Sequence, residues 1–122
     1  MKVIIAGGRD FNNYDLLKKK CDIILSNQDE VIIVSGRASG ADSLGERYAK
    51  EKGFKTELFP ADWKKYGKSA GYVRNSEMAE VAESLIAFWD GRSRGTKHMI
   101  DIAKNKGLKV RIVNYESDSS GK

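Results

Sequence analysis

The segment VIIVSGRASGAD, residues 31–42, carries the clearest sequence signal for the fold. Its unbroken apolar start is typical of a strand that a parallel sheet buries on both faces. A glycine-rich turn follows, and the apolar residues Ala41, Leu44 and Tyr48 then recur on one helix face. The stretch therefore predicts a strand, a turn and a helix, which is the unit that repeats in parallel α/β sheets.

Further strand-like runs lie on both sides of this unit. Residues 3–6 and 85–89 are also unbroken apolar runs, which predicts two more strands covered on both faces. Residues 55–59 alternate apolar and polar side chains, and residues 110–113 do so in part, so we expect them to form the two edges of the sheet.

Between these strands the apolar residues have helical spacing. Residues 17–25, 78–82 and 99–103 predict helices, and Gly53 and Gly107 are typical C-terminal stops. Because parallel strands need right-handed helical crossovers, the alternation predicts a Rossmann-like, doubly wound α/β fold. We expect a three-layer sandwich whose five-stranded parallel sheet has the order 3-2-1-4-5.

Length and composition bound the possible functions. The 122 residues suit one domain, expected at residues 1–115, followed by a flexible polar tail at residues 116–122. A net charge of +5 favours anionic partners. With one cysteine and one histidine the chain has no Cys/His zinc site and no disulfide framework, and we expect neither metal nor cofactor. No apolar run approaches the ~20 residues that span a bilayer, so we expect a cytoplasmic protein without a membrane partner.

Glycine-rich loops follow the first, second and fourth strands. In an open parallel sheet, ligands bind beyond the carboxyl ends of the strands, where the strand order reverses. Glycines there let backbone N–H groups approach an anion closely. The predicted ligand-binding residues are Gly7, Gly8 and Arg9 after the first strand, Ser35, Gly36, Arg37, Gly40 and Asp42 after the second, and Asp90, Arg94, Gly95 and Thr96 after the fourth.

Arginines gather in the same loops, whereas lysines lie mostly on helix faces. The planar guanidinium grips phosphate with two hydrogen bonds, which an ammonium does not. Arg74 and Asn75 follow a long loop, residues 59–69, which carries Trp63. Loops of this length are often functional, and we expect Trp63, Tyr66 or Tyr72 to stack on a base or to close over a ligand. The alternative for Trp63 is that it closes the top of the core. No phosphate-binding P-loop and no G-x-G-x-x-G motif is present.

These motifs together resemble a known family. The segments are GGRDF at residues 7–11, SGRASGAD at 35–42 and FPADWKKYGKSAGYVRN at 59–75. They are similar to those of the YspA (cpYpsA-related) family, in the SLOG superfamily of Rossmann-like proteins, with the Lonely Guy phosphoribohydrolases and the DprA DNA-processing proteins. The resemblance implies a nucleotide-derived ligand at the strand ends. It places around that ligand Gly36, Gly40, Asp42, Arg74, Asn75, Gly95 and Thr96.

The chain departs from the Lonely Guy pattern after the fourth strand. DGRSRGTKHM, residues 90–99, is similar to their P-G-G-x-G-T-x-x-E signature but has Met99 at the glutamate. In those enzymes this glutamate and an arginine serve cleavage of the N-glycosidic bond of a nucleoside monophosphate. Met99 supplies no carboxylate, and Asp101 lies about 200° around a helix from it, at the angular step of the α-helix.

Three functions are open from the sequence. The first is binding of a nucleotide or nucleotide derivative through its phosphate and ribose, including a sensor role. The second is hydrolysis of a nucleotide N-glycosidic bond, with Asp10, Asp42 and Arg74 as candidate catalytic residues, because an oxocarbenium-like transition state needs a carboxylate. The third is DprA-like binding of single-stranded nucleic acid, for which the lysines are too scattered to form a track. Pairing of two copies is a further expectation from the superfamily.

Overall fold

The structure, a computed structural model, describes residues 1–116 and has five parallel strands in the order β3-β2-β1-β4-β5. The strands are β1 (Lys2–Gly7), β2 (Ile32–Ser35), β3 (Lys55–Leu58), β4 (Ser84–Trp89) and β5 (Lys109–Asn114). The helices are α1 (Tyr14–Ile24), α2 (Ala41–Lys52), α3 (Trp63–Tyr66), α4 (Ala70–Val81) and α5 (Arg94–Asn105). The predicted fold class and strand order are confirmed.

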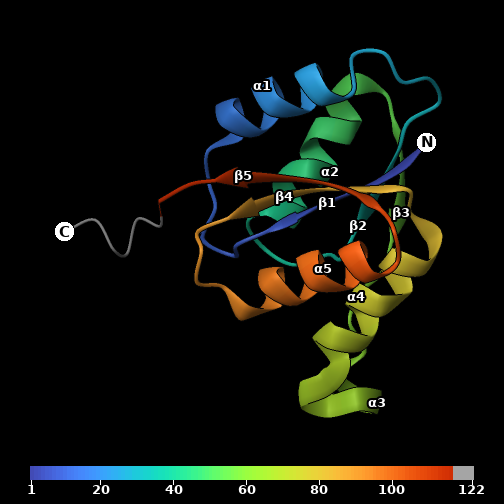
Figure 1. Cartoon of the computed structure of the whole chain (residues 1–122), viewed down its shortest axis with the longest axis vertical. Coiled ribbons are helices and arrows are strands. Elements are labelled where there is room, and N and C mark those ends of the chain that lie inside the picture. The colour runs from blue at the N-terminus through green and yellow to red at the C-terminus, as the bar shows by residue number, and fades with distance from the viewer. Residues whose placement is uncertain (117–122) are drawn as a thin grey trace.

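The strand β1 lies at the centre of the sheet and alternates its side chains between two cores. Ile4 pairs in register with Val34 of β2 and Leu85 of β4. Val3 and Ile5 pack into one core, and Ile4 with Ala6 into the other. Both faces are covered, α1 and α2 on one side and α4 and α5 on the other, as Figure 1 shows. This double burial is why the run at residues 3–6 is apolar without interruption.

The outer strands β3 and β5 form the edges, as their alternating sequences predict. Their residues are mostly exposed or partly exposed, in contrast to the fully covered residues of β4 before Trp89. An edge strand has a neighbour on one side only, so polar residues such as Lys109 and Arg111 remain in water.

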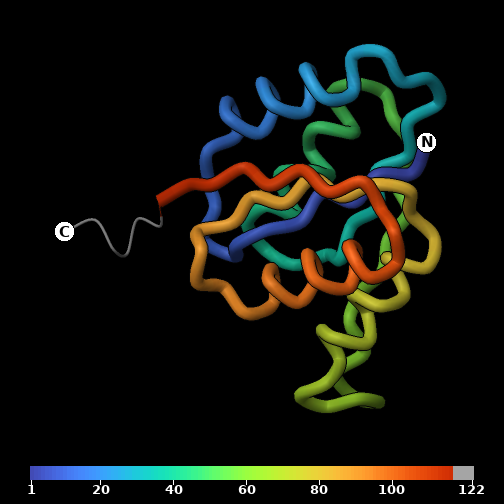
Figure 2. The backbone as a smooth tube through the Cα atoms, in the orientation of Figure 1, coloured from blue at the N-terminus to red at the C-terminus, as the bar shows by residue number. Residues whose placement is uncertain are grey.

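The predicted long loop contains short helical elements. Asp62 caps α3 by accepting a hydrogen bond from the Lys65 N–H at 3.1 Å, and a 3₁₀ turn (Gly67–Ser69) leads into α4. A four-residue helix buries too little to leave an apolar period, so the sequence pattern does not reveal it. Figures 1 and 2 show α3 projecting from the sheet, at the opposite end of the molecule from α1.

The C-terminal part of β5 continues into Tyr115 and Glu116, where the description ends. The predicted tail therefore falls, apart from Glu116, outside the described residues. Within residues 1–116, no helix has the length and apolar character needed to cross a membrane.

Candidate functional site

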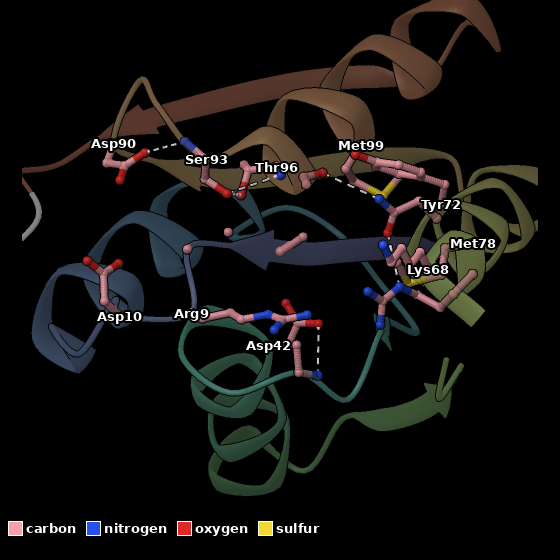
Figure 3. Close-up of a pocket in the computed structure, with 18 of the residues that line it drawn as sticks. Arg9, Asp10, Asp42, Lys68, Tyr72, Met78, Asp90, Ser93, Thr96 and Met99 are labelled. Carbon is pink, nitrogen blue, oxygen red and sulfur yellow. Dashed lines mark hydrogen bonds between the residues drawn. The ribbon is translucent and has the colours of Figure 1, made fainter. Parts of the chain in front are cut away.

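A cleft of about 510 Å³ opens at the carboxyl ends of the central strands. The loops after β1, β2 and β4 contribute to its walls, and α3, α4 and the start of α5 complete it. Figure 3 shows labelled lining residues such as Asp42, Tyr72 and Thr96. The reversal of strand order between β1 and β4 explains its position, because the two crossovers leave in opposite directions there.

Most residues predicted from the sequence line this cleft. They are Gly7, Gly8, Arg9, Asp10, Asp42, Trp63, Arg74, Asn75, Asp90, Gly95 and Thr96. Five predicted residues are not part of its lining: Ser35, Gly36, Arg37, Gly40 and Arg94. Gly36 and Arg37 instead line a second, adjoining hollow. Arg94 is an exposed residue at the start of α5.

A carboxylate on α2 accounts for the positions of Ser35 and Arg37. The Ser35 hydroxyl donates a hydrogen bond to Glu46 at 2.6 Å, and Arg37 Nη1 forms an ion pair with the same carboxylate at 2.7 Å. Arg37 also has a positive φ of 66°, which turns its backbone sharply after β2. Glu46 thus holds the β2–α2 loop against its own helix.

Close backbone contacts lock the loop after β1 to the start of α2. The Ala41 N–H donates to the Gly8 carbonyl at 3.1 Å. A Cβ atom on Gly40 would lie 2.2 Å from that same carbonyl oxygen. Only glycine allows the two loops to approach this closely. Gly40 therefore shapes the site, although its own atoms are not in the cleft wall.

Asp42 is the most deeply buried carboxylate of the cleft, with 5% of its surface exposed. Its Oδ2 accepts a hydrogen bond from the Ala38 N–H at 3.2 Å. Burial raises the pKa of Asp42 to about 6, against the opposing effects of this hydrogen bond and of the Arg74 charge. The carboxyl therefore changes its charge near neutral pH.

Two guanidinium groups face the cleft. Arg74 donates from Nη1 to the Gly36 carbonyl and from Nε to Asn75 Oδ1 at 3.0 Å. Burial lowers the pKa of Arg74. The negative charge of Asp42 opposes this shift, and the positive charge of Arg9 adds a smaller lowering. Figure 3 shows the Arg9 side chain extending from the end of β1 toward Asp42. Within residues 1–116, no hydrogen bond or ion pair holds the Arg9 guanidinium.

The loop after β4 is held by its own side chains. Asp90 Oδ1 accepts hydrogen bonds from the N–H groups of Arg92 and Ser93, at 2.8 and 2.9 Å. The Ser93 hydroxyl in turn caps α5 by accepting from the Thr96 N–H. Asp90 thus stabilises the turn that precedes α5. It is partly exposed, whereas Asp42 is buried.

Asp10 lies at the other end of the cleft. It accepts a hydrogen bond from the Tyr115 hydroxyl at 2.8 Å, and the burial of Tyr115 together with this bond raises the pKa of that phenol. The two candidate catalytic carboxylates, Asp10 and Asp42, both line the cleft. The contact with Tyr115 ties Asp10 to the segment beyond β5.

Several lining residues were not predicted from the sequence: Lys68, Met78 and Met99 belong to the wall, together with Ala38, Ser93 and Gly71. Tyr72, one of the aromatic residues expected to stack on a ligand, also lines the cleft, whereas Tyr66 does not. Met78 and Met99 are 1% exposed, so their helical spacing cannot be distinguished from that of core residues. Trp63 is 53% exposed, which excludes the alternative that it closes the core. Among residues 1–116, no group of three His, Cys, Asp or Glu side chains is placed to hold a metal ion.

Comparison with known proteins identifies the family. The family described as "YspA, cpYpsA-related SLOG family" matches residues 1–66. Gene 61 protein of Mycobacterium phage D29 is 41% identical over 119 aligned residues, covering 89% of this chain and 93% of the phage protein. A solved structure described as a predicted subunit of tRNA methyltransferase from Methanocaldococcus jannaschii matches with a TM-score of 0.40 and 16% identity, over 96% of this chain and 67% of that one. The chain belongs to the YspA, cpYpsA-related SLOG family.

Proposed function

We propose that the protein binds a nucleotide or a nucleotide derivative in the cleft at the strand ends. The observation that carries this proposal is the pair of cations, Arg9 and Arg74, that face the same cleft. Two positive charges that repel each other across a hollow are stabilised when an anion lies between them. A phosphate is the anion that guanidinium groups bind best, because its oxygens match their planar donors.

The rest of the cleft suits the other parts of a nucleotide. Its volume of about 510 Å³ is in the range of small-molecule sites. Tyr72, Met78 and Met99 supply an apolar wall against which a base would pack. Asp42 would accept a hydrogen bond from a ribose hydroxyl. Membership of the SLOG family supports the same ligand class.

A binding experiment with matched arginine variants tests the proposal. Adenosine and guanosine monophosphates are titrated into the protein by calorimetry, with thermal shift as a second readout. Arg9→Gln removes a cation without a structural partner in the described chain, so we expect the affinity to fall about tenfold while the fold is kept. Arg111→Gln, an equal charge loss on the exposed edge strand β5, is the control and should leave the affinity unchanged. If no nucleotide binds at millimolar concentration, the proposal fails.

A second candidate function, hydrolysis of a nucleotide N-glycosidic bond, rests on Asp42. Its carboxyl is buried in the cleft with a pKa of about 6, and Arg74 lies beside it. At neutral pH the ionised form would stabilise the positive charge that develops on the ribose as the base leaves and water adds to the anomeric carbon. Met99, at the position of the glutamate in the Lonely Guy enzymes, is buried in the wall and supplies no charge.

Release of free base from nucleoside monophosphates, followed by chromatography, tests this candidate. Asp42→Asn should abolish release, and Asp10→Asn should reduce it less because Tyr115 already binds that carboxylate. Calorimetry on the same variants separates loss of binding from loss of chemistry. Base release that persists in both variants would exclude these carboxylates as the catalytic groups.

A further inference from the structure

A second hollow of about 460 Å³ adjoins the cleft on the side of β2 and α3. It shares Arg9, Ala38, Trp63 and Arg74 with the lining of the cleft, so these residues form the boundary between the two spaces. Its remaining lining comes from the β2–α2 loop and from Pro60 and Ala61. A ligand that passes this boundary would occupy both spaces at once.

The two spaces differ in charge. The cleft contains three carboxylates in its lining, those of Asp10, Asp42 and Asp90. The residues that line the second hollow include no carboxylate and three guanidinium groups, those of Arg9, Arg37 and Arg74. An extended anion would therefore place its outermost negative charge in the second hollow, where attraction is not offset by lining carboxylates.

Arg37 keeps donors available although Glu46 is its ion-pair partner. The contact at 2.7 Å involves Nη1, and 49% of the Arg37 side chain is exposed. A guanidinium has five N–H donors, so one carboxylate contact leaves other donors for a ligand. The Ser35 hydroxyl donates to the other oxygen of the Glu46 carboxylate. This second contact holds the carboxylate in position to bind Arg37.

Trp63 adds a flat apolar surface at the boundary. It belongs to the lining of both spaces and is 53% exposed. An exposed indole beside guanidinium groups suits a group that is both polar and planar or ring-shaped, such as a sugar or a base. This feature favours a phosphate-linked group over a small inorganic anion.

We propose that the site takes a nucleotide with a second phosphate beyond its 5′-phosphate, either terminal or linked to a further sugar. The base and ribose lie in the cleft, the first phosphate lies between Arg9 and Arg74, and the second lies beside Arg37. This inference rests on the proposed nucleotide binding and names the ligand class within it.

The experiment compares the affinities of matched ligands. AMP, ADP and ADP-ribose, and GMP with GDP, are titrated into the full chain by calorimetry. We expect each diphosphate to bind at least about tenfold more tightly than its monophosphate, since a charge-assisted contact to Arg37 is added. ADP against ADP-ribose distinguishes a terminal phosphate from a phosphate-linked sugar, and either preference supports the proposal.

Two variants locate the effect in the second hollow. Arg37→Gln removes the cation, and Ser39→Glu adds a carboxylate at an exposed lining residue while keeping the Arg37–Glu46 ion pair. Both should reduce the ratio of diphosphate to monophosphate affinity toward one, whereas Arg111→Gln should leave the ratio at its wild-type value.

Three outcomes would overturn the inference. Equal affinity of the wild type for mono- and diphosphates would be compatible with nucleotide binding but would contradict a binding site for a second phosphate. The same conclusion follows if neither Arg37→Gln nor Ser39→Glu changes the ratio. Tighter binding of a single-stranded oligonucleotide than of any diphosphate would assign the hollow to a nucleic-acid backbone. Absence of all nucleotide binding would instead defeat the proposed function itself.

Discussion

The loops after β2 and after β4 are both glycine-rich turns that lead into a helix, yet they are built in different ways. In the β2–α2 loop, Cβ atoms on Gly36 and Gly40 would lie 2.7 Å from Arg74 Nη1 and 2.2 Å from the Gly8 carbonyl oxygen. Cβ atoms on Gly91 in the β4–α5 loop and on Gly95 in the first turn of α5 would meet nothing within 4 Å. The first loop needs glycine because other segments press on it.

The N-terminal ends of the two helices that follow also differ. The N-cap residue of α2 is Gly40, which has no side chain to cap the helix, and the Ala41 N–H donates to the Gly8 carbonyl of another loop. The N-cap residue of α5 is Ser93, whose own side chain accepts from the Thr96 N–H. The comparison shows that similar local sequence can be stabilised by tertiary contact in one place and by local capping in another.

The largest expected effect is that of Gly40→Ala. The residue has a φ of +77° and no space for a Cβ atom, so backbone strain and overpacking add. We expect the free energy of unfolding to fall by on the order of 2–6 kcal/mol, measured by urea denaturation. A variant within about 0.5 kcal/mol of the wild type would mean that the two loops do not press on each other as described.

The next largest effect concerns the pH dependence of stability, which should have opposite signs for Asp42 on α2 and Asp101 on α5. The pKa of Asp42 is raised from 3.8 to about 6, so between these values the folded protein keeps a proton that the unfolded chain releases. The stabilisation is complete below the lower value and is lost as the pH rises through the higher one. We expect wild type to lose about 3 kcal/mol relative to Asp42→Asn between pH 3.5 and 7.

Urea denaturation of both proteins across this pH range measures the difference. Asp101→Asn is the control, because the hydrogen bond from Lys97 lowers the pKa of Asp101. Its stabilisation is present at neutral pH and lost on acidification, which is the opposite sign. Parallel curves for wild type and Asp42→Asn would show that Asp42 titrates normally.

A smaller effect is expected for Gly91→Ala. Gly91 has a φ of +83° but open space around its Cβ position, so only the backbone conformation opposes alanine. The loss in the free energy of unfolding should be about 1–2 kcal/mol, clearly less than for Gly40→Ala. Equal losses at the two positions would remove the distinction between the loops.

The smallest effect, and the only gain, is expected for Gly95→Ala. Gly95 is inside α5, without a positive φ and without a neighbour near its Cβ position. Alanine should stabilise the protein by about 0.5–1 kcal/mol through helix propensity. Thermal and urea denaturation should agree on the sign. A net loss would indicate a contact at Gly95 that the described structure does not contain.

Much of the site's location could be predicted, because it follows from strand order. Once the apolar runs and the helical spacings are read as parallel strands with crossovers, the carboxyl ends of β1, β2 and β4 must meet. The orientation of each side chain could not be predicted. Arg9 and Arg94 both lie in glycine-rich loops, but only Arg9 lines the cleft. The position of Glu46 in the sequence of α2 does not predict its ion pair with Arg37.

The order of the strands, the two edges and the three loops that gather at one end of the sheet could all be predicted from the apolar pattern of the chain. Those features follow from the spacing of the apolar residues, because the periodicity of buried side chains in a strand or helix can be recognised within a short segment of sequence. Three other features come from long-range packing: Asp42 is the buried carboxylate, Arg9 and Arg74 line the same cleft, and a second hollow adjoins it. These depend on contacts such as that between Gly8 and Ala41, which join segments distant in sequence, and their geometry has no local signature.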